Sequence, residues 1–288
     1  MPMRSAAWMQ AGGIAVTLLS AAVGWAADTT SLSTRDIVQR DEYRYLGDDL
    51  STALEMRLID VRGQVRRSEV LVYRKTTRGL AKTLTKFLHP TDIKDAGTLT
   101  EEVKGHTDIQ YLYLPETKKL RQIVGKDEPW MESDLSYEDL QRLKLDDYEY
   151  ELLGVEVVDG HECYVCALRP VSPEKSTYGK QVRWIRTDNF CSIKLTFYDK
   201  RETLIKVEHA TDLRETNGAL YAWHITMEHV REHHRTELNR RWILLNTQMP
   251  DEILTTRHLR RSIDVYEHPA NLWSLWEETF YQSDHENP

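Results

Sequence analysis

Residues 54–75, LEMRLIDVRGQVRRSEVLVYRK, contain the pattern that decides the fold. Every second residue from Leu54 to Leu58 is apolar and the residues between them are charged, which is the period of a β-strand with one buried face. DVRG at 60–63 is a turn sequence, and residues 65–75 return with β-type composition. The stretch therefore predicts an antiparallel hairpin.

The same pattern recurs along most of the chain and predicts a mainly β (α+β) fold. Tandem strands with few helices favour a curled antiparallel sheet, an incomplete β-barrel of about eleven strands covered by short helices. Short helices are expected at 33–46, 136–143 and 250–259, where capping residues precede helical spacing. Further strands are expected at 80–89, 108–114, 118–124, 148–158, 161–169, 181–187, 190–198, 203–213, 219–230 and 235–246.

The ends of the chain differ from this middle part. Residues 1–26 have one charge, Arg4, before an apolar run and small residues, which is typical of a cleaved signal peptide and predicts export to the periplasm. A retained membrane anchor is the alternative. Residues 27–262 form the expected half-barrel domain. The Trp-rich extension at 263–288 is expected to form a short helix that packs on the sheet or binds a partner.

The charge balance argues against nucleic acid as a partner. Without residues 1–26 the chain loses one of 38 basic residues, Arg4, and keeps all 46 acidic residues, so its net charge changes from −8 to −9. An acidic surface repels nucleic acid and anionic membrane faces.

Two groups of residues resemble metal or redox motifs only superficially. Cys163 and Cys166 have Cys-x-x-Cys spacing, but they lie in a strand pattern, where residues three apart point to opposite faces. Buried thiols are the expectation, and a bridge between Cys166 and Cys191 is left open. In HVREHH (229–234) the Glu of a helical zinc motif is missing after the first His, so solvated histidines at a hairpin are expected instead of a metal site.

The stretch WMESDLSYEDL (130–140) brings several acids together, and Asp134 with Glu138 could form a hydrolase pair. Ser133, Asp134 and Ser136 are also good helix caps, which favours the start of a short helix. The sequence contains no nucleophile elbow, P-loop or dinucleotide fingerprint. We therefore expect that the protein is not an enzyme and that it binds no cofactor.

Five segments follow one another in a characteristic order: FLHPTDIKDAGTL (87–99), DIQYLYLPETKKLRQI (108–123), WMESDLSYEDL (130–140), YELLGVEVVDGHECYVCALRP (150–170) and NTQMPDEILTTRHL (246–259). Together they resemble the outer-membrane lipoprotein-sorting proteins of the LolA-like superfamily, over roughly residues 30–260. The sequence departs from that pattern at Trp130, Met131 and Glu132, where Phe-x-Gly is usual, and at Leu135, where an aromatic residue is usual.

This resemblance implies a soluble periplasmic carrier that binds an acyl chain of a lipid or lipoprotein in an apolar cavity. Such a carrier transfers its cargo towards the outer membrane, or to or from an exporter of the resistance-nodulation-division type. The alternative is an envelope sensor or regulatory module that detects lipid or mislocalised lipoprotein. The expected lid contacts are Trp130, Met131 and Leu135. The residues expected to line the cavity are Leu54, Met56, Trp184, Phe197, Tyr221, Trp223 and Met227.

Overall fold

The hairpin of residues 54–75 lies at the middle of one antiparallel sheet. In the computed structural model, which describes residues 32–262, strands β1 (Asp49–Ile59) and β2 (Val65–Thr77) pair in register with Met56 opposite Ser68. The turn between them is closed by the Asp60 carboxylate, which accepts hydrogen bonds of 2.8 Å from the amides of Arg62 and Gln64. The expected signal peptide and the extension at 263–288 lie outside the described residues.

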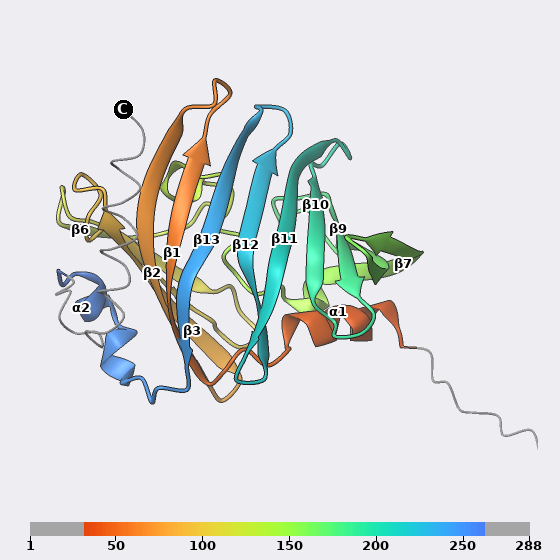
Figure 1. The fold of residues 1–288 in the computed structure, drawn as a ribbon, viewed down its shortest axis with the longest axis horizontal. Coiled ribbons are helices and arrows are strands. Elements are labelled where there is room, and N and C mark those ends of the chain that lie inside the picture. The colour runs from red at the N-terminus through yellow and green to blue at the C-terminus, as the bar shows by residue number, and fades with distance from the viewer. Residues whose placement is uncertain (1–31, 263–288) are drawn as a thin grey trace, which may run out of the picture. The chain divides into compact units, whose positions relative to one another are not determined.

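The sheet has thirteen strands in the order β6-β5-β4-β3-β2-β1-β13-β12-β11-β10-β9-β8-β7 and does not close into a barrel (Figure 1). The predicted fold class, a curled antiparallel sheet with few short helices, is confirmed. The sequence-based prediction missed β4, a run of only five residues that begins at Gly97. The remaining strands are β3 (Leu80–His89), β4 (Gly97–Glu101), β5 (Ile109–Leu114), β6 (Lys119–Gln122), β7 (Tyr148–Val158), β8 (His161–Pro170), β9 (Lys180–Arg186), β10 (Ser192–Tyr198), β11 (Leu204–Thr216), β12 (Ala219–His229) and β13 (His234–Leu245).

All neighbouring strands but one pair are also consecutive in the chain. The exception is β1 with β13, which joins the meander β1–β6 to the meander β7–β13. Met56 lies opposite Leu238 in this pair, and the register shifts at Ala53 and Leu54. The first and last strands of the described part therefore pair near the centre of the sheet.

The helices are shorter than the sequence suggested. Helix α1 (Thr34–Glu42) begins at the predicted cap, where Ser33 and Asp36 form a capping box, and it packs on β7, β8 and β9. The C-terminal helix reduces to η3 (Asp251–Ile253) and α2 (Thr256–Leu259). The helix predicted at 136–143 is wrong, because short 3-10 turns, η1 (Trp130–Glu132) and η2 (Leu145–Asp147), flank residues in turns. None of the helices in the described part of the chain is long and apolar enough to cross a membrane.

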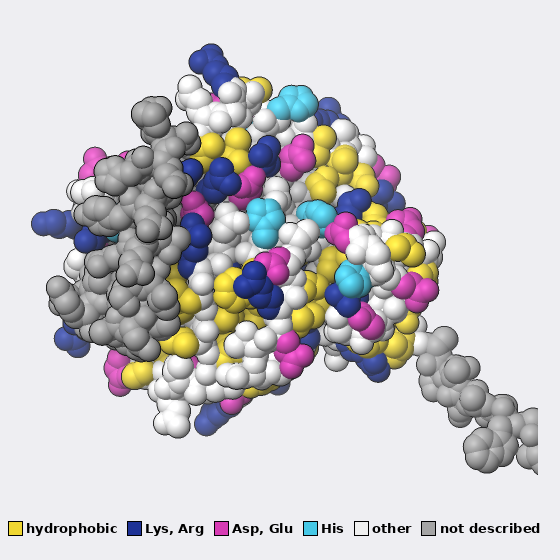
Figure 2. Space-filling model, in the orientation of Figure 1, with side chains coloured by type: hydrophobic (Ala, Val, Ile, Leu, Met, Phe, Trp, Pro, Cys, Tyr) yellow, Lys and Arg dark blue, Asp and Glu magenta, His cyan; other side chains and the backbone are white. Residues whose placement is uncertain are grey.

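The two faces of the sheet bury different clusters. The inner face, defined as the face that bears Met56, Phe197 and Met227, carries the largest set of buried aromatic and aliphatic side chains. The outer face of β2–β5 is covered by η3 and α2. Elsewhere it carries ion pairs such as Arg57 with Glu237, at 2.8 Å. Figure 2 shows charges of both signs and histidines between hydrophobic patches on the side turned to the viewer.

The three cysteines are buried free thiols, as the strand pattern predicted. Burial raises the pKa of Cys166 to about 12 and also raises the pKa values of Cys163 and Cys191. Thiols with such raised pKa values are poor nucleophiles at neutral pH.

Candidate ligand-binding site

Residues 126–143, here called the covering segment, lie against the inner face of the sheet. The segment connects β6 to η2 and runs behind β13 and β12 in Figure 1. It folds back on itself through a bridge between Pro129 and Ser136 and a hydrogen bond of 2.7 Å from the Trp130 amide to the Leu135 carbonyl. The expected helix is thus replaced by a small irregular hairpin that presents its apolar side chains to the sheet.

These apolar side chains complete one buried cluster with strands from both halves of the sheet. Trp130 is 4% exposed and Leu135 6%, and the Trp130 ring lies 5.5 Å from that of Phe87. Met131 packs against the same cluster and is half-buried. The apolar cluster consists of Met56, Val70, Phe87, Leu112, Ile123, Trp130, Leu135, Tyr137, Tyr178, Phe197 and Met227.

The tip of the covering segment adopts a conformation that glycine favours, although it contains none. Met131 has a φ of 50° and Glu132 a φ of 62°, both in the left-handed region. Glu132 stands where lipoprotein-sorting proteins usually have Gly, so this chain keeps a left-handed backbone there without the usual residue. Its side chain forms an exposed ion pair with Arg66, at 2.7 Å.

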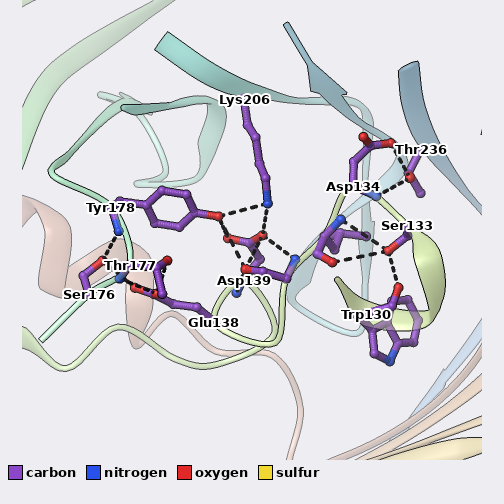
Figure 3. A network of polar contacts seen from close by, with 12 residues as sticks. Trp130, Ser133, Asp134, Glu138, Asp139, Ser176, Thr177, Tyr178, Lys206 and Thr236 are labelled. Carbon is purple, nitrogen blue, oxygen red and sulfur yellow. Dashed lines mark hydrogen bonds and ion pairs between the residues drawn. The ribbon is translucent and has the colours of Figure 1, made fainter. Parts of the chain in front are cut away.

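Asp134, in the middle of the covering segment, fixes it to the start of β13 (Figure 3). The Thr236 hydroxyl accepts from the Asp134 amide at 2.9 Å and donates to the Asp134 carboxylate at 2.7 Å. The other oxygen of this carboxylate pairs with His234 Nδ1. Burial opposes the charged imidazolium, but the bonds to Glu232 and Asp134 raise the pKa of His234 above its usual value. Both Asp134 oxygens are therefore engaged in holding the segment.

Asp139, five residues further along, fixes the segment to β11 and to the loop before β9. Its carboxylate accepts from the Tyr178 hydroxyl at 2.7 Å and from Lys206 Nζ at 3.1 Å, as Figure 3 shows. It also accepts from the Ser136 amide at 2.7 Å. Burial and the Asp139 charge raise the pKa of Tyr178, so its hydroxyl remains a donor at neutral pH. The Ser136-x-x-Asp139 capping pattern is thus present, but it closes a turn.

Glu138, the neighbour of Asp139, also fixes the segment to the loop before β9. Its carboxylate accepts from the Ser176 hydroxyl at 2.5 Å and from the Thr177 amide at 2.7 Å. Glu138 and Asp134 are the two acids that could have formed a hydrolase pair. In each of them, both carboxylate oxygens form hydrogen bonds within the protein. This arrangement suits anchoring better than acid-base catalysis, in which one carboxyl must exchange protons with a substrate.

The structure regroups the histidines at the β12–β13 hairpin. His229, Glu232 and His234 each place one ligand atom within 4.8 Å of the others, whereas His233 is not part of this group. His234 Nε2 lies 2.6 Å from the Glu232 carboxylate. Two imidazoles and a carboxylate are ligands that Zn²⁺ accepts. The sequence-based argument looked for helical spacing and so did not bring Glu232 into the group.

A cavity of about 460 Å³ adjoins the apolar cluster between α1, the covering segment and the inner face. Its apolar wall includes Leu140, Leu195 and Phe197. Most of the other lining side chains are charged; they are Asp41, Glu42, Arg44, Arg74, Glu102, Lys126, Glu138, Asp139, Arg142, Lys144, Asp147, Lys175, Arg183, Glu208 and Arg240. We call it the charged cavity. None of these charged residues was among those predicted to line a cavity.

The residues predicted to line an apolar cavity divide into three groups. Met56, Phe197 and Met227 belong to the apolar cluster, and Leu54 packs against it. Tyr221 belongs to a separate buried cluster with Leu50 and Leu245, and it lines the charged cavity.

Trp184 and Trp223 lie elsewhere, so their assignment to a cavity wall is wrong. Trp184 pairs with Lys194 and packs with Val182 on the outer face of the sheet. Its neighbour Arg183 pairs with Leu195 on the inner face, and successive residues of a strand point to opposite faces. Trp223 is half-buried under the guanidinium of Arg214, at 4.2 Å, and contributes to neither the apolar cluster nor the charged cavity.

A thirteen-stranded open sheet that curls around an internal segment defines a half-barrel class of protein, and solved structures share it. A DUF1329 family protein from Desulfovibrio piger is 26% identical, with a TM-score of 0.75, over 78% of this chain and 97% of that one. A putative outer membrane lipoprotein-sorting protein domain from Vibrio parahaemolyticus is 25% identical, with a TM-score of 0.75, over 79% and 98%. A LolA superfamily protein from Nitrosomonas europaea is 18% identical, with a TM-score of 0.64, over 79% and 100%, and shows the fold alone.

A protein-family model described only as that of an uncharacterized "-like" protein matches residues 79–261, more than half of the chain. The chain belongs to this family. The resemblance to lipoprotein-sorting proteins of the LolA-like superfamily is confirmed by the structural neighbours. No curated protein matches the chain.

Proposed function

We propose that this chain is a soluble periplasmic carrier without enzymatic activity, which binds an acyl chain of a lipid or lipoprotein on the inner face of its sheet. It would pass the cargo towards the outer membrane or exchange it with a membrane exporter. An exporter of the resistance-nodulation-division type as the partner rests on the sequence resemblance alone. The observation that supports the proposal best is that an irregular segment, not a strand or helix, covers the apolar inner face.

The covering segment can act as the lid of such a carrier. Its apolar contacts, Trp130, Met131 and Leu135, occupy the surface that an acyl chain would need. Each methylene moved from water to an apolar surface contributes about 0.8 kcal/mol. A chain of roughly ten methylenes could therefore replace the contacts that the segment loses when it moves aside. Cargo binding is then an exchange of one apolar occupant for another.

Native mass spectrometry of protein purified from its own periplasm, together with binding of a fluorescent fatty-acid probe, tests the proposal. Glu138→Gln weakens the bonds to Ser176 and Thr177, so we expect the probe to bind faster than it does to the wild type. Glu174→Gln is the matched control, because Glu174 is exposed in the same loop and bonds only to Ser172 among the described residues. A wild type without lipid, and a failure of both wild type and Glu138→Gln to bind the probe, would overturn the proposal.

A further inference from the structure

Two arginines on the wall of the charged cavity form no ion pair with a carboxylate of residues 32–262. Arg74 follows Val70 and Val72 on the inner side of β2, and its side chain makes no hydrogen bond or ion pair with residues 32–262. Arg240 lies beside Leu54 on β13. It donates to the Thr52 hydroxyl at 2.7 Å and to the Ala222 carbonyl at 3.2 Å, which are both neutral acceptors.

The surroundings of these two arginines add positive charge. Burial and the neighbouring guanidinium of Arg142 lower the pKa of Arg74, while the charge of Glu102 opposes this shift, and burial lowers the pKa of Arg240 to about 10. Arg44 also lines this part of the cavity, and its nearest carboxylate among the described residues is Asp41, at 3.9 Å. The charges of Arg74, Arg240 and Arg44 all act on the Tyr221 hydroxyl, which indicates that they converge on one place.

Another arginine of the same cavity shows what a neutralised guanidinium looks like in this fold. Arg183 pairs with both Glu42 and Asp41 of α1, and Asp41 lies 3.4 Å away. These carboxylates raise the pKa of Arg183 despite its burial. Two carboxylates of α1 thus pair with Arg183, whereas no carboxylate of residues 32–262 forms an ion pair with Arg74 or Arg240, although the charge of Glu102 acts on Arg74. A buried cation without a counter-ion is costly, which makes an external anion a favourable partner.

We propose that Arg74 and Arg240 form a subsite for a phosphate group. A guanidinium binds phosphate oxygens in a bidentate manner. A phosphate monoester carries about −1.5 to −2 charges near neutral pH, which balances two arginines better than a single carboxylate does. The Tyr221 ring, 5.3 Å from the Arg240 guanidinium, holds this arginine from the side.

The position of the subsite extends the inference to the cargo, in a step that rests on the proposed carrier function. Leu140, Leu195 and Phe197 line the same cavity, and Phe197 belongs to the apolar cluster. A lipid whose acyl chain replaces the covering segment on the inner face would thus have space for an anionic headgroup in the charged cavity. The cargo class is an amphiphile with a phosphate headgroup, in preference to a neutral one.

Affinities of the full chain for three probes test the subsite: inorganic phosphate, a long-chain phosphatidic acid, and the diacylglycerol with the same chains. We expect phosphatidic acid to bind at least tenfold more tightly than diacylglycerol, and Arg74→Gln to remove most of this difference. Arg74→Gln loses no hydrogen bond to the described residues, so it should fold, and an unchanged melting temperature without ligand checks this. Arg67→Gln is the matched control, since Arg67 lies exposed on the same strand.

The outcomes separate the subsite from the carrier function. Phosphate binding that Arg74→Gln weakens, with no binding of either lipid, supports a site for a free phosphate and overturns the carrier function. Equal binding of both lipids, unaffected by Arg74→Gln, supports the carrier and overturns the subsite. Phosphate that binds wild type, Arg67→Gln and Arg74→Gln equally is adventitious and also overturns the subsite. No binding of any probe overturns both.

Discussion

Glu208 is a carboxyl group for which the fold provides no hydrogen bond from the described residues. It lies on the inner face of β11, opposite Leu195 and Met227, and lines the charged cavity. Burial raises its pKa to about 7, and the charge of Asp139 acts in the same direction, while Arg183 opposes the shift. Asp41 and Glu42 of α1 also raise it. Between about pH 4.5 and pH 7, the folded protein therefore holds a proton on Glu208 that the unfolded chain would release.

Glu208→Gln should change how stability depends on pH. The folded-state pKa lies above the ordinary value of 4.5, so wild-type stability falls as pH rises from about 4.5 to 7. Gln imitates the protonated form, and the variant should melt at a higher temperature than the wild type at pH 8 and at a similar one at pH 5. Glu215→Gln, an exposed change on the same strand, should show no such difference. Equal melting of Glu208→Gln and wild type at pH 8 would contradict the assignment.

Single residues mark the limit of what the sequence could predict about the site. Met56, Phe197 and Met227, which were predicted to line a cavity, lie together in the apolar cluster on the inner face. Trp184 was placed on the wrong face, since an irregularity between β9 and β10 shifts the register by one residue. Arg74 had a usable signal, a charge at an inward position after Val70 and Val72. Its proximity to Arg240 had none, because 165 residues separate them in the chain.

At the scale of elements, the covering segment shows how tertiary contacts override local signals. Its sequence offers caps at Ser133, Asp134 and Ser136, and acids for a first helical turn. In the structure, Asp134 bonds to β13, Asp139 to β11, and Glu138 to the loop before β9 instead. Such side-chain bonds compete with helix formation. Partners this distant in the chain are invisible to a search for local patterns.

Thr236→Val should loosen the covering segment without unfolding the sheet. The change keeps the side-chain shape but removes the hydroxyl that serves both the amide and the carboxylate of Asp134. Losing the partner of a buried polar group costs about 1–3 kcal/mol. Hydrogen exchange followed by mass spectrometry should show faster exchange in residues 128–137 and unchanged exchange in β8–β11.

Thr117→Val is the control for this experiment, because Thr117 is exposed and bonds only to Leu114 in the turn before β6. It should leave exchange of the covering segment unchanged. Faster exchange throughout the sheet in Thr236→Val would show that the segment is part of the cooperative core and not a separable lid.

At the scale of the whole molecule, the sequence predicted the sheet well and its centre poorly. Each hairpin is local, so alternation and turn residues were enough to predict about eleven strands in tandem hairpins. The pairing of β1 with β13 joins residues about 190 positions apart, and no turn signal connects them. The open sheet came from the resemblance as well as from the strand pattern, whereas the charged cavity forms only when α1, the covering segment and both meanders come together.

Met56→Ala should weaken the entire molecule, because Met56 packs where the two meanders join. It is 1% exposed, faces Leu238 across the β1–β13 pair and belongs to the apolar cluster. We expect a loss of about 2–5 kcal/mol in the free energy of unfolding, measured in urea as one transition. Val61→Ala, in the exposed turn after β1, should change it by less than about 0.5 kcal/mol. Two separate transitions for Met56→Ala would show that the meanders unfold independently.

The central join also determines when the protein can finish folding. Because a chain is synthesised from its N-terminus onward, β1–β6 can assemble early. However, β1 keeps one unpaired edge until β13 has been synthesised. Unpaired edges recruit strands from other chains, and sheets with distant pairings fold slowly. We therefore expect the nascent protein to depend on a chaperone that shields β1 while more than 180 residues follow it. A strand from the interior of the finished sheet would then stay open to aggregation until the synthesis of β13 is complete.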